Sequence, residues 1–378
     1  MLQPTRYGRY ILLERIGVGG MGEVLAAVPA SLWGYGKLFA LKRILPGLSQ
    51  DPEFVQRFRD EARLVLPLGH PNIVQVFEVG RVERELYVVM ELVDGRDLRQ
   101  IMRRLFRRHR LVELPIPAAL YLVKELLAGL HYCHRHQDAG GRALGVVHRD
   151  VCPANVLVSF DGAVKLADFG LALSELKAAR TDPRHLMGHL SYIAPEQMGH
   201  GDVDHRADIY SAGVLLFELL TGQRFLPPGD LATLYEAKHT PAGRPSERRP
   251  EIPPMIDLLV GKAVAVDPER RFASARELSE GVQRVLARLQ PVFGPAELAE
   301  VMIEPFYRPE ARQRRLHALQ TRDLASVLDD GPIKRVDTLS YPIRSRGGSW
   351  SRRGDRSSDE DTLRWGVAAL MGESVNTD

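Results

Sequence analysis

Short runs in which apolar and polar residues alternate dominate the chain between Arg9 and Val93. A period of two residues places alternate side chains on opposite faces, so such runs predict strands. We expect strands at residues 10–13, 24–28, 38–44, 73–79 and 86–92.

One segment in this region has a helical period instead. Asp51 suits the position that caps a helix, and Pro52 suits the first helical position. The sequence therefore predicts a helix over residues 52–66 within a strand-rich lobe. Its apolar residues at helical spacing are Phe54, Phe58, Ala62 and Val65.

From Leu98 onward helical periods dominate, most clearly at residues 118–134 and 208–220. Residues 148–165 indicate a loop and a small hairpin turned by Asp161-Gly162. Another helix is expected at 296–303, and the composition after Arg312 is typical of disorder. We expect lobes at 7–93 and 94–290, and an extension at 291–378 that is partly helical and then largely disordered.

Composition narrows the classes of protein that fit this pattern. The 378 residues carry a formal net charge of only +3, which gives no reason to expect nucleic-acid binding. Cys133 and Cys152 are too few for a disulfide framework, so we expect a reducing, cytoplasmic environment. No apolar run reaches the about 18 residues that a membrane span needs.

A glycine-rich segment lies between the first two predicted strands. Because a dinucleotide fingerprint lies between a strand and a helix, and a Walker loop ends in Gly-Lys-Ser/Thr, neither fits here. A hairpin tip without side chains can offer backbone N–H groups to phosphates; a turn without a ligand is the alternative. The glycines are Gly17, Gly19, Gly20 and Gly22.

Lys42 and Glu61 suit a buried ion pair. Lys42 ends an apolar strand, and Glu61 lies in the predicted helix. An unpaired buried charge is very costly, so we expect Glu61 to hold the ammonium of Lys42 against bound phosphates. Each residue alone could equally be a surface charge.

Three further motifs follow in order, and with the glycine segment and Lys42 they resemble the protein kinase family over about residues 7–289. Residues 19–24 and 191–197 are most similar to bacterial, eukaryotic-like Ser/Thr kinases. The resemblance implies a two-lobed α+β fold, with a small antiparallel sheet and one main helix in the first lobe and a larger, mainly helical second lobe. The motifs are His148-Arg149-Asp150-Val151-Cys152-Pro153-Ala154-Asn155, Asp168-Phe169-Gly170 and Ala194-Pro195-Glu196.

The resemblance implies roles for these residues. Asp150 would accept or orient the proton of the acceptor hydroxyl, and Asn155 and Asp168 would bind Mg²⁺, or Mn²⁺, through oxygen. Lys42, held by Glu61, would bind the α- and β-phosphates of ATP. Phosphoryl transfer is mainly positioning and charge stabilisation, which this set of residues supplies.

An adenine site is implied as well. Glu91 and Val93 would offer backbone hydrogen bonds, Met90 would be the gatekeeper, and Asp97 would bind the ribose. The remaining ATP-binding residues would be Ile16, Val24, Ala40 and Leu157 around the ring and the four glycines over the phosphates. Three matched residues are expected to be structural, because losing one would leave a buried charge unpaired: Glu196, its partner Arg271, and Asp208.

Two positions depart from the family pattern. Cys152 replaces a lysine that usually touches the γ-phosphate, and His189 replaces a threonine that this lysine would contact. We hypothesise that Cys152 and His189 face each other and that protonated His189 restores part of the lost charge. The alternatives are slower transfer without compensation, and a reactive thiol at Cys152.

Regulation is suggested by Arg149, which precedes the catalytic aspartate as in kinases activated by a phosphate on the activation loop. Thr181 lies at a spacing that resembles autophosphorylated threonines of bacterial kinases, although an exposed turn threonine is the alternative. Residues 103–110 form either a solvated helix face or a docking segment for acidic or phosphorylated partners. The basic residues of this segment are Arg103, Arg104, Arg107, Arg108 and Arg110.

Taken together, the residues predict an ATP-dependent kinase that phosphorylates Ser/Thr hydroxyls of proteins, including itself, in bacterial signal transduction. A nucleotide-holding scaffold without activity is the first alternative, supported only by Cys152 and His189. A small-molecule phosphotransferase is the second, and residues 194–196 disfavour it because they resemble peptide-substrate machinery.

Overall fold

The computed structural model describes residues 3–32, 37–109, 113–138, 140–169, 190–198, 202–226, 231–238, 243–306 and 336–339. All of them belong to one compact unit, which spans Met1–Ser340. None of the helices in these ranges has both the length and the hydropathy that crossing a membrane requires.

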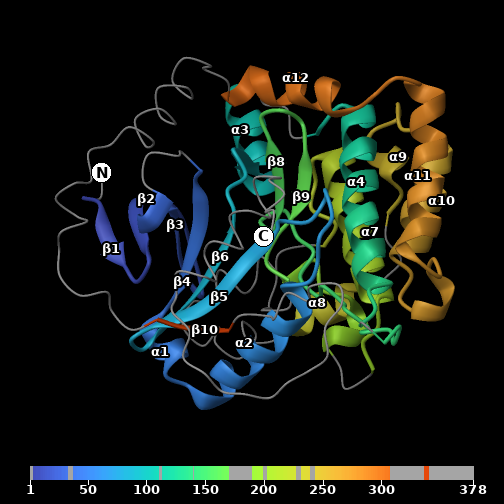
Figure 1. The fold of residues 1–378 in the computed structure, drawn as a ribbon. Coiled ribbons are helices and arrows are strands. Elements are labelled where there is room, and N and C mark those ends of the chain that lie inside the picture. The colour runs from blue at the N-terminus through green and yellow to red at the C-terminus, as the bar shows by residue number, and fades with distance from the viewer. Residues whose placement is uncertain are drawn as a thin grey trace, which may run out of the picture. The chain divides into compact units, whose positions relative to one another are not determined.

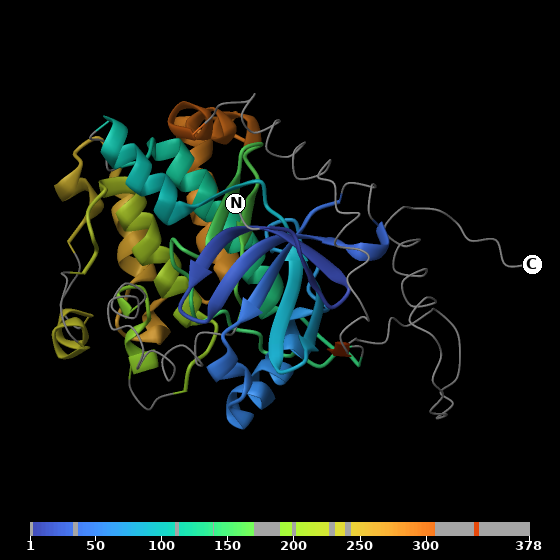
Figure 2. The ribbon, with the colours of Figure 1, turned by 90° about the vertical axis from the view of Figure 1, so that its left-hand side faces the viewer.

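The first lobe is built on a curled antiparallel sheet, seen at the left of Figure 1 and facing the viewer in Figure 2. Hydrogen-bonded neighbours follow the order β1-β2-β3-β4-β6-β5-β10. The strands are β1 (Thr5–Tyr7), β2 (Tyr10–Gly19), β3 (Gly22–Pro29), β4 (Phe39–Ile44), β5 (Val76–Val82), β6 (Glu85–Glu91) and β10 (Val336–Leu339). The short helix η1 (Ala30–Leu32) follows β3.

One main helix, α2 (Pro52–Val65), covers this sheet after the single turn α1 (Pro46–Ser49). The side chain of Asp51 accepts hydrogen bonds from the N–H groups of Glu53 (2.9 Å) and Phe54 (3.4 Å), which confirms the predicted cap. Phe54 and Phe58 are buried with Met21 of the β2–β3 turn and Ile44 of β4. The helical period of the sequence therefore predicted the packed face of α2.

The second lobe is mainly helical (Figure 1). Helix α7 is buried along its whole length from Ala207 onward, and it ends at Gly222, whose φ of 63° is readily accessible to glycine. The helices are α3 (Leu98–His109), α4 (Ile116–His134), α7 (Arg206–Thr221), α8 (Leu231–Lys238), α9 (Pro245–Arg248), α10 (Pro254–Ala263), α11 (Ala275–Leu289) and α12 (Pro295–Phe306), with short turns η2 (Pro195–Met198) and η3 (Pro268–Arg270).

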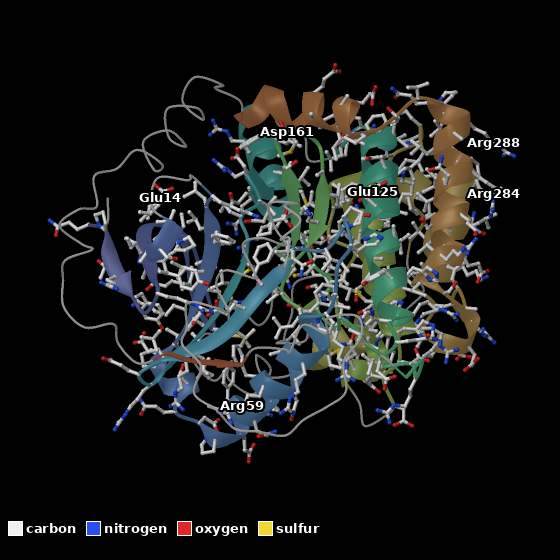
Figure 3. The ribbon with its side chains drawn as sticks, in the orientation of Figure 1. Glu14, Arg59, Glu125, Asp161, Arg284 and Arg288 are labelled. Carbon is white, nitrogen blue, oxygen red and sulfur yellow. The ribbon has the colours of Figure 1, made fainter. Side chains whose placement is uncertain are left out.

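A small sheet of β7 (Gly95–Asp97), β8 (Val156–Ser159) and β9 (Val164–Leu166) lies beside these helices. Asp161, labelled in Figure 3, is in the turn between β8 and β9 beneath α12. A Cβ atom on Gly162 would lie 1.8 Å from the carbonyl oxygen of Pro295, and the φ of Gly162 is +81°. Only glycine fits this close approach, so the predicted hairpin turn is confirmed.

Asn72, in the loop between α2 and β5, joins the two lobes. Its Nδ2 donates to Oε2 of Glu125 on α4 (2.8 Å; Glu125 is labelled in Figure 3) and to the carbonyl of Val164 on β9 (3.1 Å). Asn72 is buried, and its bond to Val164 lies away from water. This contact holds the loop after α2 against the second lobe.

Two of the differences from the sequence-based expectation come from pairing between distant segments. The strand expected from residue 73 begins at Val76, because Ile73 instead forms an isolated bridge with Leu166 of the second lobe. Strand β10 pairs Val336 with Val82 at the edge of the sheet, within the extension where no strand was expected. Pairing across such a separation depends on tertiary structure, which local patterns do not encode.

Candidate active site

Lys42 of β4 is bonded to Asp168. The Nζ atom of Lys42 lies 2.8 Å from Oδ1 of Asp168, and Lys42 is only 8% exposed. Asp168 has a φ of 58°, a conformation that costs a residue with a Cβ atom about 1–3 kcal/mol. Two positions that the sequence placed in one site are therefore in direct contact, and local strain marks one of them.

Glu61 does not form the expected ion pair with Lys42. Its Oε2 is buried without a hydrogen-bond partner. Burial raises the pKa of Glu61 to about 7, and the cations that act against this rise are Arg57 and Arg149. In this structure the carboxylate that pairs with Lys42 is that of Asp168.

The catalytic-loop residues are held by Asp208 of α7. The N–H groups of His148 and Arg149 donate to its two oxygens at 2.8 and 2.7 Å, and Nε2 of His134 lies 2.8 Å from Oδ2. Burial acts to raise the pKa of Asp208, but these hydrogen bonds outweigh it and hold the pKa below its ordinary value. Asp208 occupies the structural position that the sequence indicated.

Asp150 and Asn155 meet within this loop. Nδ2 of Asn155 donates to Oδ2 of Asp150 (2.6 Å) and to its carbonyl (2.9 Å). The N–H of Ala167 donates to the carbonyl of Asn155 at 2.8 Å, which places Asp168 beside the loop. Arg149 has a φ of 67°, so backbone strain occurs here as well.

The donors at this site suit a hard divalent cation. Because Nδ2 of Asn155 is used by Asp150, the amide presents Oδ1, and Asp168 presents a carboxylate. Mg²⁺ prefers oxygen ligands and is usually bound by one or two protein side chains together with phosphates.

The residues expected around adenine form one apolar cluster. Ala40 and Met90 are buried in it with Val74 and Ala167. The expected residues Ile16, Val24, Val93 and Leu157 pack against this cluster.

The glycine segment is a hairpin tip, since Gly19 pairs with Gly22 across β2 and β3. A Cβ atom on Gly22 would lie 1.9 Å from the carbonyl oxygen of Arg43, whereas Gly19 and Gly20 face open space. Gly22 is thus required for packing, whereas Gly19 and Gly20 leave the hairpin tip open to close approach by a ligand.

The two polar residues expected near adenine and ribose are both engaged. Oε2 of Glu91 lies 2.9 Å from Nζ of Lys165, and the N–H of Glu91 donates to Gln75 at 2.9 Å. Asp97 accepts from the N–H of Gln100 (2.8 Å) at the start of α3, and burial raises its pKa.

The remaining predicted residues divide into described and undescribed positions. Arg271 forms a two-pronged pair with Glu196 at 2.7 and 2.8 Å, as expected. Cys152 is 2% exposed, which disfavours a reactive thiol. Thr181 and His189 lie outside the described residues, so their roles stay predictions.

Several anchoring residues escaped the sequence-based reasoning. The hydroxyl of Tyr192 donates to Glu218 of α7, the hydroxyl of Ser211 donates to the carbonyl of Tyr192 (2.8 Å), and Lys238 of α8 donates to neighbouring carbonyls. No local pattern marks these side chains, because each acquires its partner only through tertiary packing.

Comparison with known proteins agrees with this site. Residues 10–281 match the family described as protein kinase domain. A Myxococcus xanthus protein named Tyrosine-protein kinase MasK is 38% identical over 288 residues, covering 76% of this chain and 44% of that relative. Serine/threonine-protein kinase PknB of Mycolicibacterium smegmatis is 35% identical over 284 residues, covering 73% of this chain and 43% of that relative. The chain thus spans less than half the length of these relatives.

A solved structure gives the same match at the level of the fold. The crystal structure of the Mycobacterium tuberculosis PknI kinase domain aligns with a TM-score of 0.59 and 30% sequence identity. The alignment covers 75% of this chain and 99% of that domain.

Proposed function

Because the chain belongs to the protein kinase family and matches bacterial Ser/Thr kinases, we propose that it transfers the γ-phosphate of Mg-ATP to Ser/Thr hydroxyls of proteins, itself included. The observation that supports this most is spatial. Lys42 from the first lobe meets Asp168 from the second, and Asn155 meets Asp150 beside them.

Each of these side chains has a task in the proposed reaction. Lys42 binds phosphate oxygens, and Asn155 orients the Asp150 carboxylate, which takes the proton of the acceptor hydroxyl. Asn155 and Asp168 would hold the divalent metal. When bound, that metal supplies positive charge which offsets the charge on the phosphates.

Glu61 is proposed to act after a movement of α2. In this structure its carboxylate faces Arg57 and Arg149, while Lys42 holds Asp168. A shift of α2 toward β4 would give the buried Glu61 oxygen the Lys42 ammonium as a partner, which removes an unsatisfied group. Phosphorylation of Thr181, paired with Arg149, is the proposed trigger.

Tyrosine is the second candidate acceptor. The relative from Myxococcus xanthus carries the name of a tyrosine-protein kinase, and Cys152 replaces the lysine that Ser/Thr kinases usually have there. Residues 191–197 favour Ser/Thr, so we rank tyrosine second.

The proposed partners are protein substrates, with residues 103–110 as a docking segment. Arg103 and Arg104 are exposed on α3, which suits contact with acidic partners. Arg107, Arg108 and Arg110 are not among the described side chains. A cytoplasmic location and a role in bacterial signalling are proposed together with this function.

Labelled ATP with Mg²⁺ tests the proposal. Wild type is expected to label itself, and Asp150→Asn is expected to remain unlabelled although it still binds nucleotide. Phosphoamino-acid analysis then separates Ser/Thr from Tyr, and peptide mapping shows whether Thr181 carries the phosphate. Nucleotide binding without transfer in wild type would instead support the scaffold alternative.

A further inference from the structure

Lys238, the last residue of α8, is a buried lysine outside the phosphate-binding site. It is 2% exposed, and its Nζ donates to the backbone carbonyls of Ser191 (3.4 Å) and Ile193. The ammonium lies 5.4 Å from the centroid of the Tyr210 ring. The described groups that contact it are therefore a ring and two neutral carbonyls.

No carboxylate among the described residues pairs with this lysine. Within the part of the chain that the structure describes, Glu196 of η2 is the one acid whose charge raises its pKa, and Glu196 is already held by Arg271. Arg271 lies over the other titratable neighbour, Tyr210 of α7, at 5.0 Å. Burial consequently lowers the pKa of Lys238 to about 7.

The two hydrogen bonds fit a neutral amine. A neutral lysine amine has two N–H groups, and two carbonyls receive bonds from Lys238. Among the described residues, the third N–H group of a protonated amine would have only the Tyr210 ring as a partner, which is weaker than a carbonyl in a site closed to water.

These contacts determine the shape of one short segment, residues 190–193. The carbonyl of Tyr192 is held by Ser211 of α7, so all three carbonyls of residues 191–193 are bound by side chains of α7 and α8. The segment directly precedes Ala194-Pro195-Glu196, which we assigned to peptide-substrate machinery. Two of the side chains that hold it are titratable: Glu218, which accepts from the Tyr192 hydroxyl and whose pKa is raised by burial, and Lys238. Their effects have opposite signs, because closing favours the protonated form of Glu218 and the neutral form of Lys238.

We propose that Lys238 positions the acceptor-binding segment 190–193 and that proton uptake by its amine loosens this segment. The part of the inference that concerns acceptors rests on the proposed kinase function. Lys238 is a positioning residue, since it acts on the acceptor only through the segment.

The direction of the pH effect follows from linkage. A solvent-exposed lysine keeps its proton up to about pH 10.4, whereas the closed site releases it near the lowered pKa. Between these two pH values, opening of the segment takes up a proton. Each unit of acidification therefore raises the equilibrium constant for opening by up to about tenfold. Below about pH 7 both forms are protonated and the effect levels off.

Hydrogen exchange tests this without any enzyme assay. Protection of residues 190–198, corrected for intrinsic exchange, is expected to be at least about tenfold higher at about pH 9 than at about pH 7 in wild type. Lys238→Met removes the titrating group and is expected to abolish the difference. Because Lys238→Arg retains a charge at every pH, the segment is expected to be weakly protected at both pH values in this variant.

Lys262→Met is the matched control. Lys262 also lies over an aromatic ring, Phe272 at 4.3 Å, but it is exposed and paired with Glu277 at 2.9 Å. This variant is expected to behave as wild type. Equal protection of wild type at both pH values would overturn the proposal, and so would a pH difference that persists in Lys238→Met. If Lys238→Met does not fold, the comparison of wild type with Lys238→Arg decides the proposal.

Steady-state kinetics tests the proposed effect of Lys238 on acceptor binding. In wild type, the KM for a protein acceptor is expected to fall as pH rises from about 7 to about 9. In Lys238→Met, this KM is expected to be higher than in wild type and independent of pH. The KM for ATP is expected to be unaffected by the substitution. An acceptor KM that is unchanged in Lys238→Met would refute the positioning role. A chain without any transfer would refute the proposed function, while hydrogen exchange still decides the role of Lys238.

Discussion

Lys42 contacts Asp168, at 2.8 Å, rather than Glu61. One residue comes from strand β4 and the other follows strand β9, so this ion pair spans the two lobes. The same two residues would bind the phosphates and the metal, and the pair therefore keeps both side chains in place before a nucleotide arrives.

Replacing the lysine tests its electrostatic role. Lys42→Met is expected to lower phosphoryl transfer about a hundredfold or more, because a positive charge on the phosphates is lost. Stability is expected to change little, since Met fills the buried volume and the Asp168 side chain, 35% exposed, remains hydrated. Transfer rates measured beside thermal unfolding would show both effects; a large loss of stability would contradict the second.

Glu61 is expected to destabilise the folded state when ionised. Its pKa rises from 4.5 to about 7 on folding, so the folded state binds more protons between these values and stability falls as pH rises through them. Glu61→Gln is expected to gain about 1–2 kcal/mol at about pH 8, allowing for solvent screening, and almost nothing at about pH 4.5.

Urea unfolding at the two pH values measures this gain. Glu53→Gln on the same helix is a suitable control, because its side chain is 79% exposed. A gain of equal size at both pH values would mean that ionisation of Glu61 is not the cause. Transfer activity is expected to fall in Glu61→Gln although stability rises.

The buried pair of Arg271 with Glu196 is expected to dominate the stability of its region. The Arg271 side chain is 0% exposed and that of Glu196 is 13% exposed. Arg271→Met is expected to cost about 3–5 kcal/mol, because Glu196 keeps an unpaired charge. Arg270→Met, at a neighbour that is 83% exposed, is the control in the same unfolding measurement and is expected to cost under about 0.5 kcal/mol.

Metal removal tests the pair of oxygen donors. Chelation is expected to stop transfer, and added Mg²⁺ or Mn²⁺ is expected to restore it. Asn155→Ala removes one ligand and the hydrogen bond to Asp150, so it is expected to need more metal for half-maximal transfer and to have a lower kcat at saturation. A metal requirement identical to that of wild type would contradict the role of Asn155 as a ligand.

Local sequence was enough to predict most individual elements. The cap at Asp51, the apolar stripe of Phe54 and Phe58, and the turn at Asp161-Gly162 are all visible as patterns within a few residues of each other, although the partners that bury them are distant. The candidate site residues Lys42, Asp150, Asn155 and Asp168 were identified by their motifs, whose spacing is likewise a property of the chain alone.

Partner choice between distant residues was decided by tertiary structure. Glu61 is placed by how α2 packs on the sheet, β10 by pairing with the edge of β5, and Lys238 by the contact of α8 with residues 191–193. Local propensity and motif spacing carry no information on such contacts, because their free energy comes from burial, charge and hydrogen bonding between segments that are far apart in the chain. Residue types and motif order thus indicated the family and the proposed chemistry of the site, whereas packing determined which charged groups pair with each other.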